Sequence, residues 1–310
     1  MHTIFFAATR EAEHLHRLDA YFIVAALGVL LLVAFLTLYY SIKYRARPDS
    51  PEPAQTSSNL KLEAVMIVGP TLLIGFFFFL TIRTTRAVLP AAGGATPAVV
   101  VTGHQWWWQA TYPGTSVETA NEIHLPVGRR LLIEGRAADV IHDWWVPAFG
   151  EKMDVLPGRA NHLWVTIKEP GVYIGACNEF CGQQHAWMRI RVVAHTPADY
   201  ARWLAAAARP AAAPTPADTL AGRGAALFAH YACADCHQIR GTLAAGHQGP
   251  DLTHFGSRRT MLAGLLPNNA DNLRRWLSNP QALKPGAHMP RFIFGRDTIR
   301  ALTTYLTQLK

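Results

Sequence analysis

The sequence predicts a multidomain membrane protein that joins a two-helix transmembrane hairpin to a β-sandwich or barrel and then to a further, helical domain. The first observation is that half of the 310 residues are hydrophobic and only 16% are charged, with two long apolar runs near the N-terminus. The second is a change, over residues 95–195, to short strand-like segments separated by Gly and Pro. The third is an Ala- and Pro-rich segment at residues 196–218, which predicts a linker before a domain at residues 219–310.

Residues 18–86 predict the transmembrane hairpin. Residues 20–40 and 64–82 are each a nearly unbroken apolar run of roughly 20 residues, enough for a helix to cross a bilayer. The loop between them carries four basic residues, Lys43, Arg45, Arg47 and Lys61. Because basic loops stay in the cytoplasm, we expect the polar residues 1–17 and the chain beyond the hairpin to lie outside. A secretory signal is excluded by the length of the first run, the acidic residues before it and the missing cleavage site.

Charge and cysteine usage argue against two other classes of protein. The formal net charge is +8, but the basic residues form no nucleic-acid-binding pattern and many of the arginines flank the apolar runs. We therefore expect membrane lipid, and no nucleic acid, among the partners. Four cysteines could form two disulfides outside the cytoplasm. However, each of two ligand motifs takes two of them, which leaves none for a disulfide.

The first ligand motif places two thiols, an imidazole and a thioether within twelve residues. Its side chains are Cys177, Cys181, His185 and Met188. Soft sulfur donors beside imidazole select copper or an iron–sulfur cluster over magnesium or calcium. A zinc site would usually pair its ligands more closely and would not need the Met. The alternative is a buried loop whose soft residues pack together for unrelated reasons. The motif predicts a copper site, with His142 as the further ligand.

This pattern resembles the copper-A domain of cytochrome c oxidase subunit II. The residues that carry the resemblance are His142, Cys177, Glu179, Cys181, His185 and Met188. The resemblance implies a cupredoxin fold in which both thiolates bridge two coppers and each copper takes one His. It also implies that Met188 and the Glu179 backbone carbonyl complete the shell, and that the Glu179 side chain holds magnesium at the boundary with subunit I. One departure is Asp143, where the family usually has Ser, and it puts the tuning of the copper in doubt.

Two residues outside the motif acquire roles from the same resemblance. In the family, electrons enter at the Trp after Gly-His-Gln, which here is Trp106. We expect it to be an exposed aromatic over the metal, and strand alternation would expose Trp107, the middle of three adjacent tryptophans. Core packing with domain docking is the alternative. Glu63 lies at the cytoplasmic end of the second span, and its position alone indicates a charged helix-end residue in contact with water. The resemblance instead implies a proton path into subunit I.

The second ligand motif is Cys233-Ala234-Asp235-Cys236-His237, the C-x-x-C-H signature of covalent c-type haem attachment. The two thiols would form thioethers and His237 would be the proximal ligand. Met289, in His288-Met289-Pro290, is the expected sixth ligand; Met261 is its rival but falls in a predicted helix. The surrounding helical pattern resembles an all-α class I cytochrome c, and His/Met ligation suits an electron carrier that reduces copper.

Together the motifs predict the electron-delivery subunit of a proton-pumping haem–copper cytochrome c oxidase with a fused cytochrome c. Its partners would be subunit I, with haem and copper-B, subunit III, and cytochrome c or another periplasmic donor. Because c-type haem is attached outside the bacterial cytoplasmic membrane, the chain would sit in that inner membrane with both redox domains on the periplasmic side. Two alternatives are the small subunit of a copper-A nitric oxide reductase and a free-standing membrane-anchored electron carrier or copper-handling protein.

Overall fold

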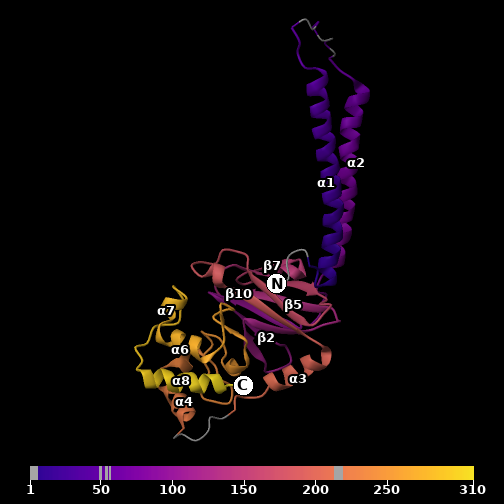
Figure 1. Ribbon diagram of the computed structural model, residues 1–310. Helices are drawn as coiled ribbons and strands as arrows, with labels where there is room; N and C mark the ends of the chain where they lie inside the picture. The colour runs from indigo at the N-terminus through magenta and orange to yellow at the C-terminus, as the bar shows by residue number, and fades with distance from the viewer. Residues whose placement is uncertain (1–5, 49–50, 53–54, 56, 213–218) are drawn as a thin grey trace. The chain divides into compact units, whose positions relative to one another are not determined.

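The computed structural model describes residues 6–48, 51–52, 55, 57–212 and 219–310. It divides into two compact units (Figure 1). One comprises residues 13–90. The other comprises the described residues up to Ala12 together with Ala91–Lys310.

The smaller unit is a helical hairpin of α1 (Arg10–Lys43) and α2 (Leu60–Val88). Both helices are long and apolar enough to cross a membrane, and their most apolar windows are not buried by the rest of the protein. The rings of Phe22 and Phe77 stack with their centroids 4.1 Å apart, which brings the two helices together. Asn59 caps α2 by accepting a hydrogen bond from the Leu62 N–H. Each helix is longer than the apolar run that predicted it.

The larger unit begins with two five-stranded sheets (Figure 1). The first has the order β3-β2-β1-β5-β8, with strands Glu118–Ala120, Trp107–Thr111, Val99–His104, Leu131–Ala137 and Asn161–Val165. The second has the order β4-β10-β9-β6-β7, with strands Glu122–Pro126, Arg189–His195, Gly171–Cys177, His142–Trp145 and Lys152–Val155. The 3₁₀ turns η1 (Pro147–Phe149) and η2 (His185–Trp187) lie in their loops, and helix α3 (Pro197–Ala207) follows β10. The alternating strands bury one apolar core that includes Trp108, Trp144 and Ile133.

The three adjacent tryptophans do not alternate between core and solvent. Trp106, Trp107 and Trp108 are 9%, 8% and 0% exposed. Trp107 is covered because its ring stacks on His104 with the centroids 4.3 Å apart. The expectation that the middle tryptophan is exposed is therefore wrong. The cause is a neighbouring side chain on the hairpin partner strand, where His104 pairs with Trp107.

The C-terminal part of the larger unit is helical. Its helices are α4 (Leu220–His230), α5 (Cys233–Cys236), α6 (Ala270–Ser278), α7 (Pro280–Leu283) and α8 (Arg296–Gln308), with η3 (Phe255–Ser257) and the short strands β11 (Thr260–Met261) and β12 (Leu266–Pro267) between them. Helices α4 and α8 approach closely because Gly224 has no side chain: a Cβ there would lie 2.2 Å from the Ala301 carbonyl oxygen. Met261 lies in a two-residue strand, so the prediction that it falls in a helix is wrong.

The helical part is joined to the sandwich by polar contacts as well as by the chain. The buried carboxylate of Glu122, in β4, accepts hydrogen bonds from the backbone N–H groups of Arg259 and Thr260 and from the Thr260 hydroxyl. The Arg240 guanidinium donates to the carbonyls of Ala207 and Ala208 at the end of α3. These contacts place both redox motifs in one compact unit. The expected linker includes residues 213–218, which lie outside the described residues.

Candidate functional site

Three strands bring the ligands of the first motif together at one end of the sandwich. β6 begins at His142, and β9 ends at Cys177, whose strand partner in β6 is Trp144. The loop that follows returns to the sheet at once, because the Cys177 N–H donates a 2.9 Å hydrogen bond to the Met188 carbonyl just before β10. A loop pinned at both ends holds its side chains over a small volume. The ligand atoms of His142, Cys177 and Cys181 all lie within 4.8 Å of one another.

The remaining predicted donors surround the two thiols. The sulfur atoms of Cys177 and Cys181 are 3.8 Å apart. His142 Nδ1 lies 3.9 Å from the Cys177 sulfur, and His185 Nδ1 lies 3.6 Å from the Cys181 sulfur. The Met188 sulfur is 3.9 Å from the Cys181 sulfur, and the Glu179 carbonyl oxygen is 3.2 Å from the Cys177 sulfur. The structure therefore gathers two thiols, two imidazoles, a thioether and a carbonyl. This soft donor set fits copper.

The orientation of the His142 ring is fixed by Asp139, on the side of the ring away from the thiols. His142 is fully buried, and its Nε2 lies 2.8 Å from Asp139 Oδ1, so that Nδ1 faces the thiols. Burial acts to lower the pKa of His142, but hydrogen bonds to Cys177 and Asp139 outweigh it and raise that pKa. Gly103 provides the space for the ring: a Cβ there would lie 2.8 Å from His142 Cδ2.

The two cysteines are electrostatically unequal in the absence of metal. The hydrogen bond between the two sulfur atoms lowers the pKa of the Cys177 thiol to about 3 and raises the pKa of the Cys181 thiol. Both are almost fully enclosed, at 5% and 3% exposed. Thiolate is the form that binds metal, so one ligand is already prepared. Binding of a cation would release the second proton.

Asp143 is buried beside this cluster rather than facing solvent. It is 2% exposed and pairs across β6 and β7 with Asp154. Burial, followed by the neighbouring Asp154 carboxylate, raises the pKa of Asp143 to about 7. Its backbone carbonyl accepts a hydrogen bond from the Asn178 N–H. Asn178 lies at the start of the loop of residues 177–188, called the ligand loop below.

Trp106 contacts the ligand loop directly. Its indole Nε1–H donates a 2.9 Å hydrogen bond to the Cys181 carbonyl, and the Gln105 amide donates to the same oxygen at 2.8 Å. The adjacent Gly182, at φ +111°, leaves room for the indole; a Cβ there would lie 3.1 Å from Trp106 Cζ2. The expectation of an exposed aromatic is wrong, because the helical part of the unit covers this residue. His288 packs against its ring with the centroids 4.9 Å apart.

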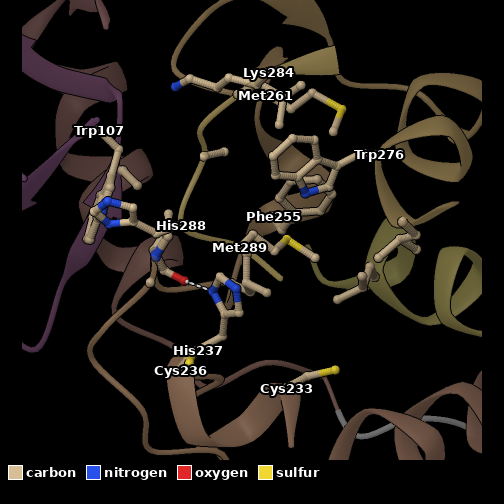
Figure 2. A pocket seen from close by; sticks show the side chains of 18 of the residues that line it. Trp107, Cys233, Cys236, His237, Phe255, Met261, Trp276, Lys284, His288 and Met289 are labelled. Atoms are coloured by element: carbon tan, nitrogen blue, oxygen red, sulfur yellow. Dashed lines mark hydrogen bonds between the residues drawn. The ribbon is translucent and has the colours of Figure 1, made fainter. Parts of the chain in front are cut away.

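The second motif opens onto a cavity of about 360 Å³ (Figure 2). Cys233 and Cys236 lie on one side of it, and His237 projects into it. His237 Nδ1 lies 2.8 Å from the Pro250 carbonyl, which leaves Nε2 for a ligand. Burial lowers the pKa of His237, so the imidazole is held neutral, as a metal ligand must be. The cavity, the two thiols and this histidine fit a covalently attached haem.

Two methionines line the cavity, and they lie differently with respect to His237. In the view of Figure 2 the Met289 thioether lies close to the His237 ring, and the Met261 thioether lies farther from it, toward Trp276. Apolar side chains make up most of the remaining lining, including Phe228, Phe255 and Leu273. This arrangement favours Met289 as the sixth haem ligand.

Lys284 also lines this cavity, although it belongs to no sequence motif. It is only 5% exposed, and its Nζ donates a 2.9 Å hydrogen bond to the Trp106 carbonyl. Burial lowers the pKa of Lys284 to about 8. The only sequence signal is its position five residues before Met289. Nothing in the sequence distinguishes it from an exposed lysine.

The two remaining predicted residues are exposed. The Glu63 carboxylate accepts a 3.0 Å hydrogen bond from the Asn59 N–H and so stabilises the start of α2. Its geometry is that of a helix-end residue. Glu179 is exposed, and its backbone carbonyl oxygen lies beside the Cys177 sulfur.

Comparisons with known proteins identify both domains of the larger unit. The family model for the periplasmic domain of cytochrome c oxidase subunit II matches residues 114–195, and that for cytochrome c matches residues 221–310. Cytochrome c oxidase subunit 2 of Alkalihalophilus pseudofirmus is 38% identical over 203 residues, which cover 65% of this chain and 58% of the relative. Probable cytochrome c oxidase subunit 2 of Rickettsia bellii is 31% identical over 214 residues, which cover 62% and 79%.

A solved structure is also similar. The crystal structure of the periplasmic domain of subunit II of cytochrome oxidase of Bradyrhizobium japonicum is 32% identical, covers 38% of this chain and 96% of that chain, and gives a TM-score of 0.36. The chain spans 52–58% of the length of the first three curated relatives.

The predicted fold class is confirmed, with two apolar N-terminal helices, a cupredoxin-like sandwich and a helical cytochrome c domain. The chain belongs to the cytochrome c oxidase subunit II family and carries a cytochrome c domain after the cupredoxin-like domain.

Proposed function

We propose that this chain is the subunit through which electrons reach a proton-pumping haem–copper cytochrome c oxidase. Electrons would pass from its own haem c, by way of Trp106 and a dinuclear copper-A centre, to the haem of subunit I, where oxygen is reduced to water. The observation that carries the proposal is that a soft six-donor cluster and a C-x-x-C-H cavity share one compact unit. Trp106 contacts residues of both.

The sandwich residues would hold a copper pair in a nearly rigid, water-poor site. When bound, the pair supplies a one-electron centre whose charge is spread over two metals. Cys177, Cys181, His142 and His185 would hold the coppers through their sulfur and imidazole nitrogen atoms, and Met188 with the Glu179 carbonyl would supply the remaining ligands. Because the loop is hydrogen-bonded to the sheet and its sulfurs are buried, the ligands would move little between oxidation states.

The helical residues would hold the haem. Cys233 and Cys236 would attach it covalently, and His237 and Met289 would supply the ligands to its iron. The hydrogen bond from His237 to the Pro250 carbonyl fixes the ring orientation, and the apolar lining keeps water away.

The chain is a membrane-anchored protein with a periplasmic domain. We propose the bacterial inner membrane as its location and the catalytic subunit I as its partner, with subunit III beside it and cytochrome c or another periplasmic donor supplying electrons. The exposed Glu179 carboxylate would contribute to a magnesium site at the subunit I boundary, and Glu63 to proton uptake.

The test is spectroscopy on the full chain, purified with its partners. The expected result is a multi-line copper hyperfine pattern from one electron shared over two nuclei, together with a low-spin c-type haem spectrum. A large multispan haem protein should co-purify, and the complex should consume oxygen. A mononuclear copper signal would overturn the copper assignment. If the complex reduces nitric oxide and not oxygen, the chain is the small subunit of a nitric oxide reductase. If no catalytic subunit co-purifies, the chain is a free-standing electron carrier.

A further inference from the structure

One loop of the cytochrome c domain covers the face of the sandwich at which Trp106 lies. The loop runs from Lys284 to Met289, and residues at both of its ends belong to the haem cavity. Lys284 donates its hydrogen bond to the Trp106 carbonyl, and the His288 ring lies against the Trp106 ring at a centroid distance of 4.9 Å and an interplanar angle of 55°. As a result, Trp106 is only 9% exposed.

The same loop is fitted to the ligand loop at a second point. Gly286, at φ +85°, lies so close to Gln183 that a Cβ would be 2.2 Å from the Gln183 amide oxygen. The left-handed conformation favours glycine at this position. A different segment of the cytochrome c domain also contacts the sandwich, where the Arg189 N–H donates to the Ala263 carbonyl at 3.3 Å. The contact is thus built from backbone, ring and charged groups, which is more than two surfaces touching by chance.

These contacts form a continuous line between the two predicted sets of ligands. Met289 is bonded through the chain to His288, whose ring touches that of Trp106. The Trp106 indole donates a 2.9 Å hydrogen bond to the carbonyl of Cys181, whose sulfur belongs to the thiol cluster. The line therefore consists of covalent bonds, one ring contact and one hydrogen bond. Electronic coupling falls off more slowly along bonded and closely packed atoms than across empty space.

We propose that His288 is an electron relay between Met289 and Trp106 and that Lys284 is the positioning residue that holds the two domains in register for it. The proposal rests on the function proposed above. One electron moves along the line for each electron that the haem loses and the copper pair gains. No bond forms or breaks, and no proton is required. Since the loop covers Trp106, a soluble donor protein could not reach this residue. It would have to reduce the haem, and not the copper directly.

The experiment compares four variants of the full chain, loaded with both cofactors. His288→Ala removes the ring, His288→Phe restores an aromatic ring, and Lys284→Met keeps the length of the side chain but removes the donor. His230→Ala is the matched control, because it deletes an exposed histidine of the same domain that does not line the cavity. The first measurement is the rate of electron equilibration between haem and copper after photoreduction of the haem.

We expect the rate to fall by about tenfold or more in His288→Ala, since changes next to the ligands of a metal centre typically cost about 10–100-fold. His288→Phe should recover most of that loss, and His230→Ala should match the wild type. A rate unchanged in His288→Ala would overturn the relay. A His288→Phe rate as slow as that of His288→Ala would do the same, by pointing to structural disruption.

The second measurement is hydrogen–deuterium exchange of residues 103–108, which does not depend on electron transfer. Lys284→Met should raise exchange there in both the metal-free and the loaded chain, and His288→Phe should not. Unchanged exchange in Lys284→Met would overturn the positioning role. The copper and haem spectra of each variant separate the two proposals. If the wild-type chain lacks either spectrum, the proposed function fails; if both are present and only the variant rates are unaffected, this inference alone fails.

Discussion

The Asp139 carboxylate links the His142 side chain to the backbone at Gln105. Its Oδ1 lies 2.8 Å from His142 Nε2, and its Oδ2 accepts a 2.6 Å hydrogen bond from the Gln105 N–H, one residue before Trp106. One carboxylate therefore fixes both a predicted copper ligand and the backbone next to Trp106. This is the relation of a metal-bound histidine to the carboxylate behind it.

Replacing Asp139 by Ala should weaken copper binding by about 10–100-fold, because His142 would lose the group that orients its ring and raises its basicity. Asp139→Asn, which keeps an acceptor oxygen, should lose less. The measurement is copper removal by a competing chelator, followed by the copper spectrum. Equal affinity in the wild type and Asp139→Ala would show that packing alone orients the histidine.

Replacing both Cys233 and Cys236 by Ser should abolish covalent haem attachment and leave the copper site intact. The two thiols border the cavity, and Ser cannot form the thioether bonds. Haem staining after denaturing electrophoresis measures the attachment, and the copper spectrum of the same sample is the internal control. Haem that stays bound through denaturation would contradict the assignment of these cysteines.

Replacing Gly249 by Ala should displace the His237 ring. A Cβ at this position would lie 2.6 Å from His237 Cε1, far inside contact distance. Overpacking of this kind costs about 1–3 kcal/mol, so we expect a lower midpoint of thermal unfolding and a smaller fraction of low-spin haem. Gly295→Ala is the matched control, since nothing lies within 4 Å of a Cβ there. A normal haem spectrum in Gly249→Ala would show that the ring moves freely.

Replacing Glu122 by Ala should weaken the attachment of the cytochrome c domain to the sandwich. The carboxylate is 3% exposed and accepts from Arg259 and Thr260, and Arg191 Nε lies 3.6 Å away. Removing one partner of a buried charged network costs about 3–5 kcal/mol. Calorimetry of the full chain should then resolve separate transitions where the wild type shows coupled ones. Glu122→Gln should fall between the two. A single unchanged transition in Glu122→Ala would contradict a joining role.

The local parts of the site could be predicted from the sequence. Cys177 to Met188 lie in one loop, so their spacing alone indicated a shared ligand site, and Cys233 to His237 form a contiguous signature. The non-local parts could not. Lys284 and His288 cover Trp106, and they lie nearly 180 residues further along the chain. Local sequence around Trp106 therefore could not predict its burial. Lys284 has no pattern of its own; its burial depends on how two domains meet.

Glu151, which no motif includes, provides a pH-dependent test of the fold. The residue comes shortly after η1 in the chain. Its side-chain atom Oε2 is buried without a hydrogen-bond partner among the described residues. Burial, followed by the negative charge of Glu11, raises the pKa of Glu151 from 4.5 to about 7, against the attraction of Arg130. Between these two pKa values, Glu151 is protonated in the folded chain and ionised in the unfolded chain.

Between pH 4.5 and pH 7 this carboxyl group should therefore make the folded state progressively less stable as the pH rises, and the loss should be complete above pH 7. Glu151→Gln removes the charge, so it should gain about 1–2 kcal/mol over the wild type at pH 8, after allowance for solvent screening. At pH 4.5 the two proteins should be nearly equal. Thermal unfolding of the metal-free chain at both pH values measures the difference, with the exposed Glu169→Gln as the control. An equal gain at both pH values would mean that shape, and not the charge of Glu151, is responsible.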